Sequence, residues 1–160
     1  MQERTSAIQL ATVLLSAALS ASAAEPKVAT PQTKAENASV LRALPFSDKK
    51  SFDDAQRGFV APLSQDVIKA QDGRPVWNPK QYAFIKPGSE APDTVNPSLW
   101  RQSQLINISG LFKVAERIYQ VRNQDLSNMS IVEGDQGIIV IDPLISAETG
   151  KAALDLYYQH

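Results

Sequence analysis

The stretch SNMSIVEGDQGIIVIDPL, from Ser127 to Leu144, decides the fold of this chain. Residues 128–133 alternate apolar and polar side chains, which is typical of a half-buried strand. Gly134 to Gly137 has the composition of a hairpin turn, with glycine where a positive φ is needed. Residues 138–141 are all apolar, so we expect a strand whose two faces are both covered. The sequence therefore predicts a β-hairpin that ends at Asp142, because the proline that follows cannot donate to a strand ladder.

A strand and a helix flank this hairpin. IYQVR, residues 118–122, predicts a short strand, and residues 123–125 read as a polar turn. After the hairpin, Ser146 is a favourable N-cap, and the apolar spacing that follows predicts a helix over residues 147–160. The order strand, strand, strand, helix indicates a mixed α/β (α+β) domain. A further strand would pair in parallel with the all-apolar one through a right-handed crossover, and we expect the domain to be incomplete because none follows.

Residues 24–104, which precede this domain, differ from it in composition. It holds all ten prolines except Pro143, and its aromatic residues stand between turn signals. Residues 24–43 predict a flexible lead-in. Residues 44–104 predict an irregular arm with short helices near 51–57 and 63–70. The domain proper is expected to span residues 105–160.

The N-terminal sequence MQERTSAIQLATVLLSAALSASAAEP predicts a signal peptide over residues 1–23. Arg4 forms a weak basic region, Ile8–Leu19 is mostly apolar, and Ala21-Ser22-Ala23 is a small-residue cleavage site. The apolar run is shorter than the roughly 20 residues of a membrane span. We therefore expect export to the periplasm or medium, a mature chain that starts at Ala24, and no stable membrane anchor.

Composition excludes several classes of function. Sixteen basic and seventeen acidic residues are mixed along the chain, without the basic stripe of a nucleic-acid-binding protein. The absence of cysteine removes disulfides, thiolate zinc sites and cysteine nucleophiles. The single histidine, His160, cannot supply a catalytic relay or a histidine metal site. We therefore expect no Ser-His-Asp or Cys-His relay and no histidine-built metal site within this chain.

Three stretches resemble one family. LFKVAERIYQVRNQDLSNMSIVEGDQGIIVIDPLISAETGKAALDLYYQH resembles the opening of the catalytic domain of the linear alkyl sulfatases, which are exported members of the metallo-β-lactamase superfamily. LPFSDKKSFDDAQRGFVAPL and PDTVNPSLWRQSQLINISGLFKV are similar to the N-terminal arm of that family. The resemblance covers about residues 44–160. It implies that the chain is the N-terminal part of an αββα sandwich.

The resemblance also implies a chemistry. Complete members of the family hold two zinc ions, which activate water. They hydrolyse long-chain alkyl sulfate esters, such as dodecyl sulfate, to alcohol and sulfate, and they are homodimers. Their first zinc ligands come from a His-x-His-x-Asp-His motif after the helix that matches residues 147–160. These ligands would lie beyond residue 160, and His160 corresponds to none of them. The resemblance therefore implies no catalytic residue and no metal ligand within this chain, and we expect it to be inactive alone.

Asp142 is the one site residue that the resemblance carries over. It matches the acidic residue that ends the second hairpin strand, next to the loop that bears the histidines. A carboxylate at this place can accept hydrogen bonds from that loop and orient it. The alternative is that Asp142 only ends a strand before a proline and bonds to local amides.

Three interpretations of the whole chain remain open. The first is an N-terminal fragment of an alkyl sulfatase, which an unpaired apolar edge strand and a final helix without a capping glycine would favour. The second is a small exported non-catalytic module that binds amphiphiles through Trp77, Tyr82, Phe84 and Trp100. The third is an interaction subunit that completes a partner chain by strand addition along residues 138–141.

Overall fold

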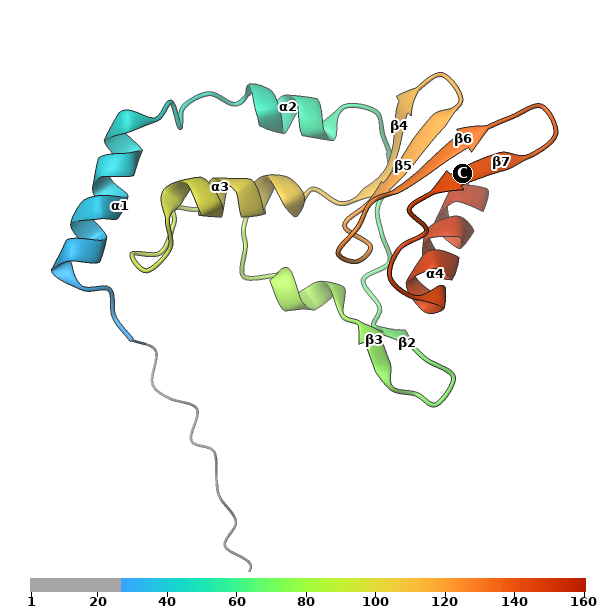
Figure 1. The fold of residues 1–160 in the computed structure, drawn as a ribbon, viewed down its shortest axis with the longest axis horizontal. Helices are drawn as coiled ribbons and strands as arrows, with labels where there is room; N and C mark the ends of the chain where they lie inside the picture. The colour runs from blue at the N-terminus through green and yellow to red at the C-terminus, as the bar shows by residue number, and fades with distance from the viewer. Residues whose placement is uncertain (1–26) are drawn as a thin grey trace, which may run out of the picture.

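The computed structural model describes residues 27–160, so the predicted signal peptide, residues 1–23, lies outside the described residues. Figure 1 shows an arm of helices that leads into a twisted sheet with one helix against it. The elements in chain order are α1 (Pro31–Ala43), α2 (Lys50–Gln56), β1 (Phe59–Ala61), β2 (Ile68–Lys69), β3 (Pro75–Trp77), a 3-10 helix η1 (Pro79–Tyr82), α3 (Pro97–Ile106), β4 (Gly110–Ala115), β5 (Ile118–Arg122), β6 (Met129–Glu133), β7 (Ile138–Ile141) and α4 (Ala147–Tyr158).

The main sheet has five strands in the order β1-β4-β5-β6-β7, and each neighbouring pair is antiparallel. The predicted strands at residues 118–122 and 138–141 form at these bounds, and β6 lies within the predicted 128–133. The expected mixed α+β class is confirmed. β1 and β4, which complete the sheet, were not predicted, because short strands are stabilised by pairing rather than by a pattern of their own.

One face of this sheet packs against α4 and forms the core. Leu111, Val121, Met129 and Ile131 are buried there, together with Ala153 of α4. Ile131 stands opposite Val140 in the β6–β7 ladder, which directs both side chains to the same face. Burying one such side chain stabilises the fold by about 1.5–3 kcal/mol.

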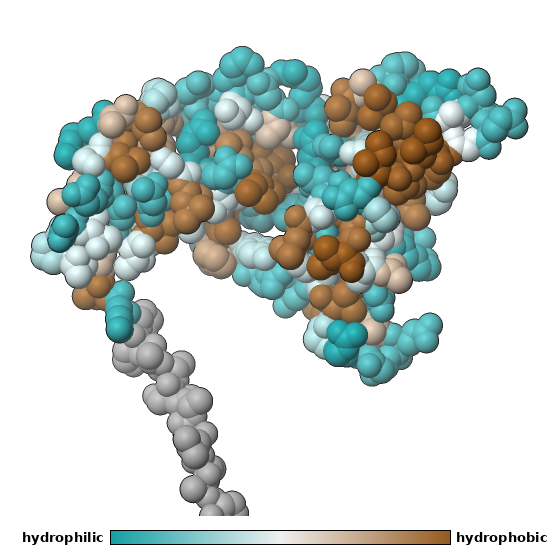
Figure 2. All heavy atoms as spheres, in the orientation of Figure 1, coloured by the Kyte–Doolittle hydropathy of each residue, from teal (hydrophilic) through white to brown (hydrophobic). Residues whose placement is uncertain are grey.

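The opposite face of the sheet is open over β7. Ile139 and Ile141 are 63% and 55% exposed, whereas Ile138 and Val140 pack against the core. The prediction that both faces of this strand are covered is therefore wrong for this chain, because α4 covers only one of them. Figure 2 shows an apolar surface in this region of the molecule.

The hairpin turn between β6 and β7 also differs from expectation. Neither Gly134 nor Gly137 adopts a positive φ. The turn closes instead through a hydrogen bond of 2.7 Å from the Gly134 N–H to the Gly137 carbonyl.

The arm is more regular than its composition suggests. α1 occupies most of the predicted flexible lead-in, residues 24–43. Thr30 caps α1 by accepting a hydrogen bond from the Thr33 N–H, and Pro31 stands at the first helical turn, where proline is tolerated. α1 has no buried residue. It is held to the loop before α3 by Asn37, which donates to the Asp93 carbonyl at 2.9 Å.

Of the two helices expected in the arm, one forms. α2 matches the predicted helix near residues 51–57. The helix predicted at 63–70 is absent, and this segment contains β2, which pairs with β3. Leu63 and Trp77 are buried, so tertiary packing outweighs the local preference of the segment.

Candidate functional site

The loop between β7 and α4, residues 142–146, contains Asp142, the one candidate site residue that the sequence predicts. Asp142 and Leu144 have φ angles of 54° and 74°, in the left-handed region. Aspartate tolerates this region, whereas leucine rarely adopts it. A loop with two such residues needs contacts that hold it in place.

Asp125 provides these contacts. Its side chain is 3% exposed, and Oδ2 accepts hydrogen bonds from the Ile145 N–H at 3.0 Å and from the Thr149 hydroxyl at 2.7 Å. Oδ1 accepts from the Ser127 N–H at 2.9 Å. The carboxylate thus links the β5–β6 connection to the loop and to the first turn of α4.

The start of α4 is fixed by two further contacts. Ser146 is the N-cap, as predicted, and its Oγ accepts from the Thr149 N–H at 3.1 Å. Gly150 lies so close to the loop that a Cβ there would stand 2.8 Å from the Pro143 carbonyl oxygen. Any larger residue at this position would have to displace the backbone of the loop.

Asp142 itself is exposed. Among residues 27–160, its side chain makes no hydrogen bond and no ion pair. The alternative in which it bonds to local amides is therefore not what the structure shows, and its orienting role stays a prediction. The carboxylate that holds the loop of residues 142–146 in this structure is Asp125, which the sequence analysis did not single out.

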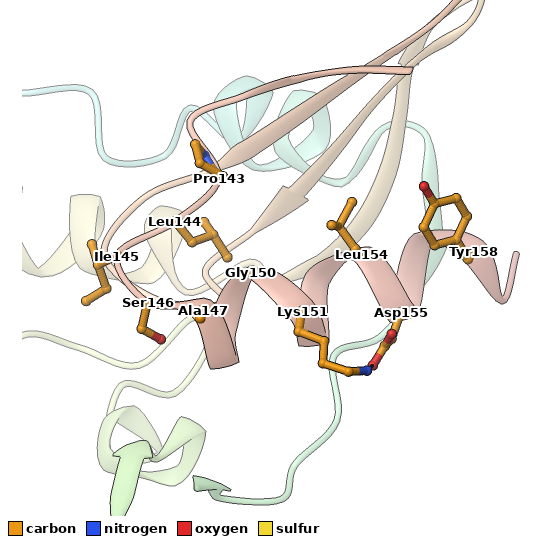
Figure 3. A pocket seen from close by; sticks show the side chains of 10 residues that line it. All are labelled: Pro143, Leu144, Ile145, Ser146, Ala147, Gly150, Lys151, Leu154, Asp155 and Tyr158. Atoms are coloured by element: carbon orange, nitrogen blue, oxygen red, sulfur yellow. Dashed lines mark hydrogen bonds and ion pairs between the residues drawn. The ribbon is translucent and has the colours of Figure 1, made fainter. Parts of the chain in front are cut away.

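A shallow hollow of about 640 Å³ lies beside this loop. Figure 3 shows the side chains that line it. Leu144 and Ile145 of the loop border it, and Leu154 and Tyr158 of α4 line its other side. Its charged members, Lys151 and Asp155, pair with each other at 2.5 Å. Apart from this pair, only Ser146 and Tyr158 bring a polar side-chain group to the lining.

Within residues 27–160, no group of three or more histidine, cysteine, aspartate or glutamate residues could hold a metal ion. A catalytic zinc site takes three protein ligands. The described residues therefore do not fit the zinc ions that the resemblance implies.

The aromatic residues proposed as an amphiphile site form two separate pairs. The rings of Trp77 and Tyr82 lie 6.0 Å apart, and those of Phe84 and Trp100 lie 6.3 Å apart. Both tryptophans are buried, and Trp100 Nε1 donates to the Ser89 carbonyl at 2.9 Å. The two tryptophans thus belong to the packing of the arm, whereas Phe84 is 65% exposed. In the same described part of the chain, no helix has the length and apolarity of a membrane span.

No family model matches the chain. It is 65% identical to a linear primary-alkylsulfatase of Pseudomonas sp over 84% of its own length and 20% of that protein. It is 49% identical to an (R)-specific secondary-alkylsulfatase of Pseudomonas sp, over 94% of this chain and 22% of that one. An alkyl/aryl-sulfatase of Saccharomyces cerevisiae is 48% identical over 84% of this chain and 21% of that one.

This chain is homologous to the N-terminal portion of the alkylsulfatases. A solved structure agrees: the stereoselective inverting sec-alkylsulfatase Pisa1 of Pseudomonas sp superposes with a TM-score of 0.77 and 51% identity, over 85% of this chain and 21% of that one. Its double mutant gives a TM-score of 0.76 over 84% and 21%. The chain spans about a fifth of the length of these alkylsulfatases. The predicted resemblance and fold class are confirmed.

Proposed function

We propose that this chain is the N-terminal portion of an exported zinc-dependent sulfatase that hydrolyses linear primary-alkyl sulfate esters, such as dodecyl sulfate, to alcohol and sulfate. Homology to alkylsulfatases supports sulfate ester hydrolysis in general. The finer assignment to primary esters is carried by one observation. Identity to the linear primary-alkylsulfatase is 65%, against 49% and 48% for the other two relatives.

In this proposal the 160 residues do not act alone. Within residues 27–160, no side-chain set can hold zinc, so two zinc ions and the sulfate would be held by residues outside this chain. The contribution of this part is a rigid edge of the scaffold, in which Asp125 fixes the loop that carries Asp142. Export as a mature chain from Ala24 and assembly as a homodimer complete the proposal.

The first experiment is to determine the nucleotide sequence beyond the codon for His160. The chain would then be expressed both as the 160 residues and with any in-frame continuation. Zinc content and sulfate release would be measured with dodecan-1-yl sulfate and with a dodecan-2-yl sulfate of the same length. We expect turnover and stoichiometric zinc in the longer protein alone, with the primary ester preferred.

Each part of the proposal can fail separately. Tight stoichiometric zinc or turnover in the 160-residue chain would show that it acts alone. Preference for the secondary ester would overturn the substrate assignment. A stop codon followed by unrelated DNA would favour a non-catalytic amphiphile-binding or partner-completing module. Cell fractionation tests export, and a cytoplasmic chain that keeps its first 23 residues would contradict it.

A further inference from the structure

The start of the described chain differs from the rest in how little of it is buried. No residue of the segment 27–60 is buried, and the first buried position is Ala61 of β1. α1 and α2 lie within this segment, and neither helix has a buried residue. Figure 1 shows α1 at the far end of the arm from the sheet and α2 beside α3. An isolated helix of 13 residues is marginally stable in water, so contacts with the rest of the chain decide whether α1 persists.

Three hydrogen bonds and one ion pair join residues 27–57 to the rest of the described chain. Two of these contacts hold α1, and both go to Asp93. The Asn37 side-chain amide donates to the Asp93 carbonyl at 2.9 Å, and Lys34 Nζ lies 2.6 Å from the Asp93 carboxylate. Both members of the ion pair are exposed. Exposed ion pairs contribute little to stability, so α1 is weakly attached.

Two arginines hold α2, one at each end of the helix. Arg101 of α3 donates to the Asp48 carbonyl at 2.8 Å, just before α2 begins. Its guanidinium also lies 4.9 Å from the centre of the Phe52 ring. Arg122 of β5 donates at 3.0 Å to the carbonyl of Ala55, in the last turn of α2. The attachment of α2 thus depends on these polar contacts and on the half-buried ring of Phe52.

The packing beneath this segment is incomplete. A cavity of about 470 Å³ lies between α2, the residues before α3 and the sheet, and a hollow of about 360 Å³ lies between the α1–α2 connection and α3. Phe52 and Gln56 of α2 line one side of the cavity, and its other side is mainly apolar, with Ile108 and Phe112. Protein interiors are normally close-packed. This boundary therefore lacks much of the dispersion attraction that holds other elements together.

The segment nevertheless holds together internally. The connection between α1 and α2 is closed by a backbone hydrogen bond of 3.0 Å from the Asp48 N–H to the Pro45 carbonyl. The Asp48 carboxylate in turn accepts from the Lys50 N–H, at the start of α2, at 2.8 Å. Units that open cooperatively in native proteins are contiguous segments of this kind, with few buried apolar contacts to their surroundings.

Gly58 is the fixed end of the segment. Its φ is 74°, in the left-handed region, and its carbonyl accepts from the Lys113 N–H at 2.7 Å. A Cβ at this position would clash with the Lys113 carbonyl oxygen, so only glycine fits here without a shift of the backbone. Directly after Gly58, β1 pairs with β4. The chain is therefore anchored to the sheet from Gly58 onward.

We propose that residues 27–57 form a strap that opens as one unit about Gly58 and uncovers the apolar cavity beneath α2, while the sheet and α4 stay folded. Opening exchanges a few polar contacts for contacts with water, which costs much less than exposing the core. The two arginine contacts set how often the strap opens. The proposal rests on these contacts and does not depend on the proposed hydrolysis.

The test is native-state hydrogen exchange of the 160-residue chain, at urea concentrations below its unfolding midpoint. α4 is the matched reference helix, because it has 12 residues against 13 in α1 and buries Thr149, Gly150 and Ala153. We expect amides of α1 and α2 to exchange at least about a hundredfold faster than those in the middle of α4 and of β5, after correction for intrinsic rates. Urea should accelerate α1 and α2 together, because one opening exposes both.

Variants test the contacts that hold the strap. Arg101→Gln should accelerate exchange in both α1 and α2 at least about threefold and leave β5 unchanged. Asp93→Asn, which removes the ion pair with Lys34, should act in the same direction on both helices. The matched control is Arg74→Gln, because Arg74 is an exposed arginine whose side chain faces only Asp72, at 4.0 Å. It should change nothing in the strap. Far-UV circular dichroism would confirm that each variant is folded.

Access to the cavity can be followed with a single thiol, because the chain has no cysteine. Ile108→Cys places the thiol in the cavity wall. Its alkylation should accelerate in the Arg101→Gln background by the same factor as exchange in α2. An unchanged alkylation rate would show that the strap does not cover the cavity.

Three exchange results would overturn the proposal. Exchange of α1 and α2 as slow as that of α4 would show that the segment opens only when the whole chain unfolds. Different responses of the two helices to urea would show two independent helices instead of one strap. Unchanged exchange in both Arg101→Gln and Asp93→Asn would show that these contacts do not hold it. A failure here leaves the hydrolysis proposal intact, because turnover tests that proposal and exchange tests this one.

Discussion

The carboxylate of Asp125 accepts three hydrogen bonds, and all three donors are neutral groups: two backbone amides and one hydroxyl. A buried charge in this setting is stabilised by hydrogen bonds alone. In the sequence, Asp125 belongs to a polar turn two residues before Ser127, a spacing typical of aspartate turns. That spacing accounts for one of the bonds, and the other two come from residues 20 and 24 positions away.

We expect Asp125→Ala to lower the free energy of unfolding by about 2–4 kcal/mol, because it removes the acceptor of the Ser127 and Ile145 amides and the shortest hydrogen bond of the Thr149 hydroxyl. Asp125→Asn, which keeps one acceptor oxygen, should cost less. Urea unfolding measures the change. The control is Asp135→Ala, an exposed member of a surface ion pair with Arg117, which should cost less than about 1 kcal/mol. Equal losses for Asp125 and Asp135 would show that the three bonds do not hold the loop.

Asp142 calls for a different prediction, because its side chain has no partner among residues 27–160. In a complete alkylsulfatase that contains this segment, Asp142→Ala should lower zinc content or turnover about 10–100-fold. The free energy of unfolding should fall by about 1 kcal/mol, because alanine tolerates the left-handed backbone less well than aspartate. Asp142→Asn tolerates the left-handed backbone equally well, so it separates loss of charge from backbone effects. Unchanged metal content and rate in both variants would contradict this role and would show that Asp142 only ends a strand.

At the scale of elements, α4 is attached to the sheet by an aromatic contact as well as by its apolar face. The ring of Tyr157 meets that of Tyr119 of β5 edge-on, with centres 5.5 Å apart. The Tyr157 hydroxyl donates to Glu133 of β6 at 2.8 Å. Burial, followed by this hydrogen bond to a carboxylate, raises the pKa of Tyr157 to about 12.

This pKa predicts a loss of stability in alkali. An unfolded tyrosine ionises near pH 10, whereas folded Tyr157 keeps its proton up to about pH 12. Between these values the unfolded state binds fewer protons than the folded state, so the free energy of unfolding falls as pH rises. The contribution is complete below pH 10. Urea unfolding from pH 8 to 12 should show a shallower decline for Tyr157→Phe than for the parent chain. Parallel curves would contradict the assignment.

At the scale of the whole molecule, the two faces of the sheet are covered to different extents. α4 closes one face, and the arm covers part of the other, where Phe112 of β4 is fully buried and Arg122 of β5 donates to the Ala55 carbonyl of α2 at 3.0 Å. β7 stands at the edge of the sheet, and half of its side chains are exposed. An apolar edge of this kind favours association with other chains.

A matched pair of substitutions tests this asymmetry. Ile139→Thr, at an exposed position, should change the free energy of unfolding by less than about 0.5 kcal/mol and reduce self-association. Ile131→Thr, at a fully buried position on the neighbouring strand, should cost about 2–3 kcal/mol. Urea unfolding and sedimentation velocity measure the two effects. Unaltered association of Ile139→Thr would show that the exposed face is not the contact.

The local sequence was sufficient to determine β5, β6, β7, α2 and α4, because period-two alternation, a proline stop and a serine cap act within a few residues. The Thr30 cap of α1 followed the same rules and could have been recognised. Three long stretches taken together carried the resemblance to the alkyl sulfatases, and the comparisons confirmed that resemblance.

Only the tertiary structure decided the rest. β1 joins the sheet by pairing with a strand some 50 residues later, and the segment around β2 abandons its helical preference because Leu63 and Trp77 are buried. Asp125 meets Ile145 and Thr149 only after the sheet and α4 have packed. The packing of α4 likewise decides which face of β7 is covered and which stays exposed. These pairings and contacts join segments that are distant in the sequence, so local sequence patterns do not predict them.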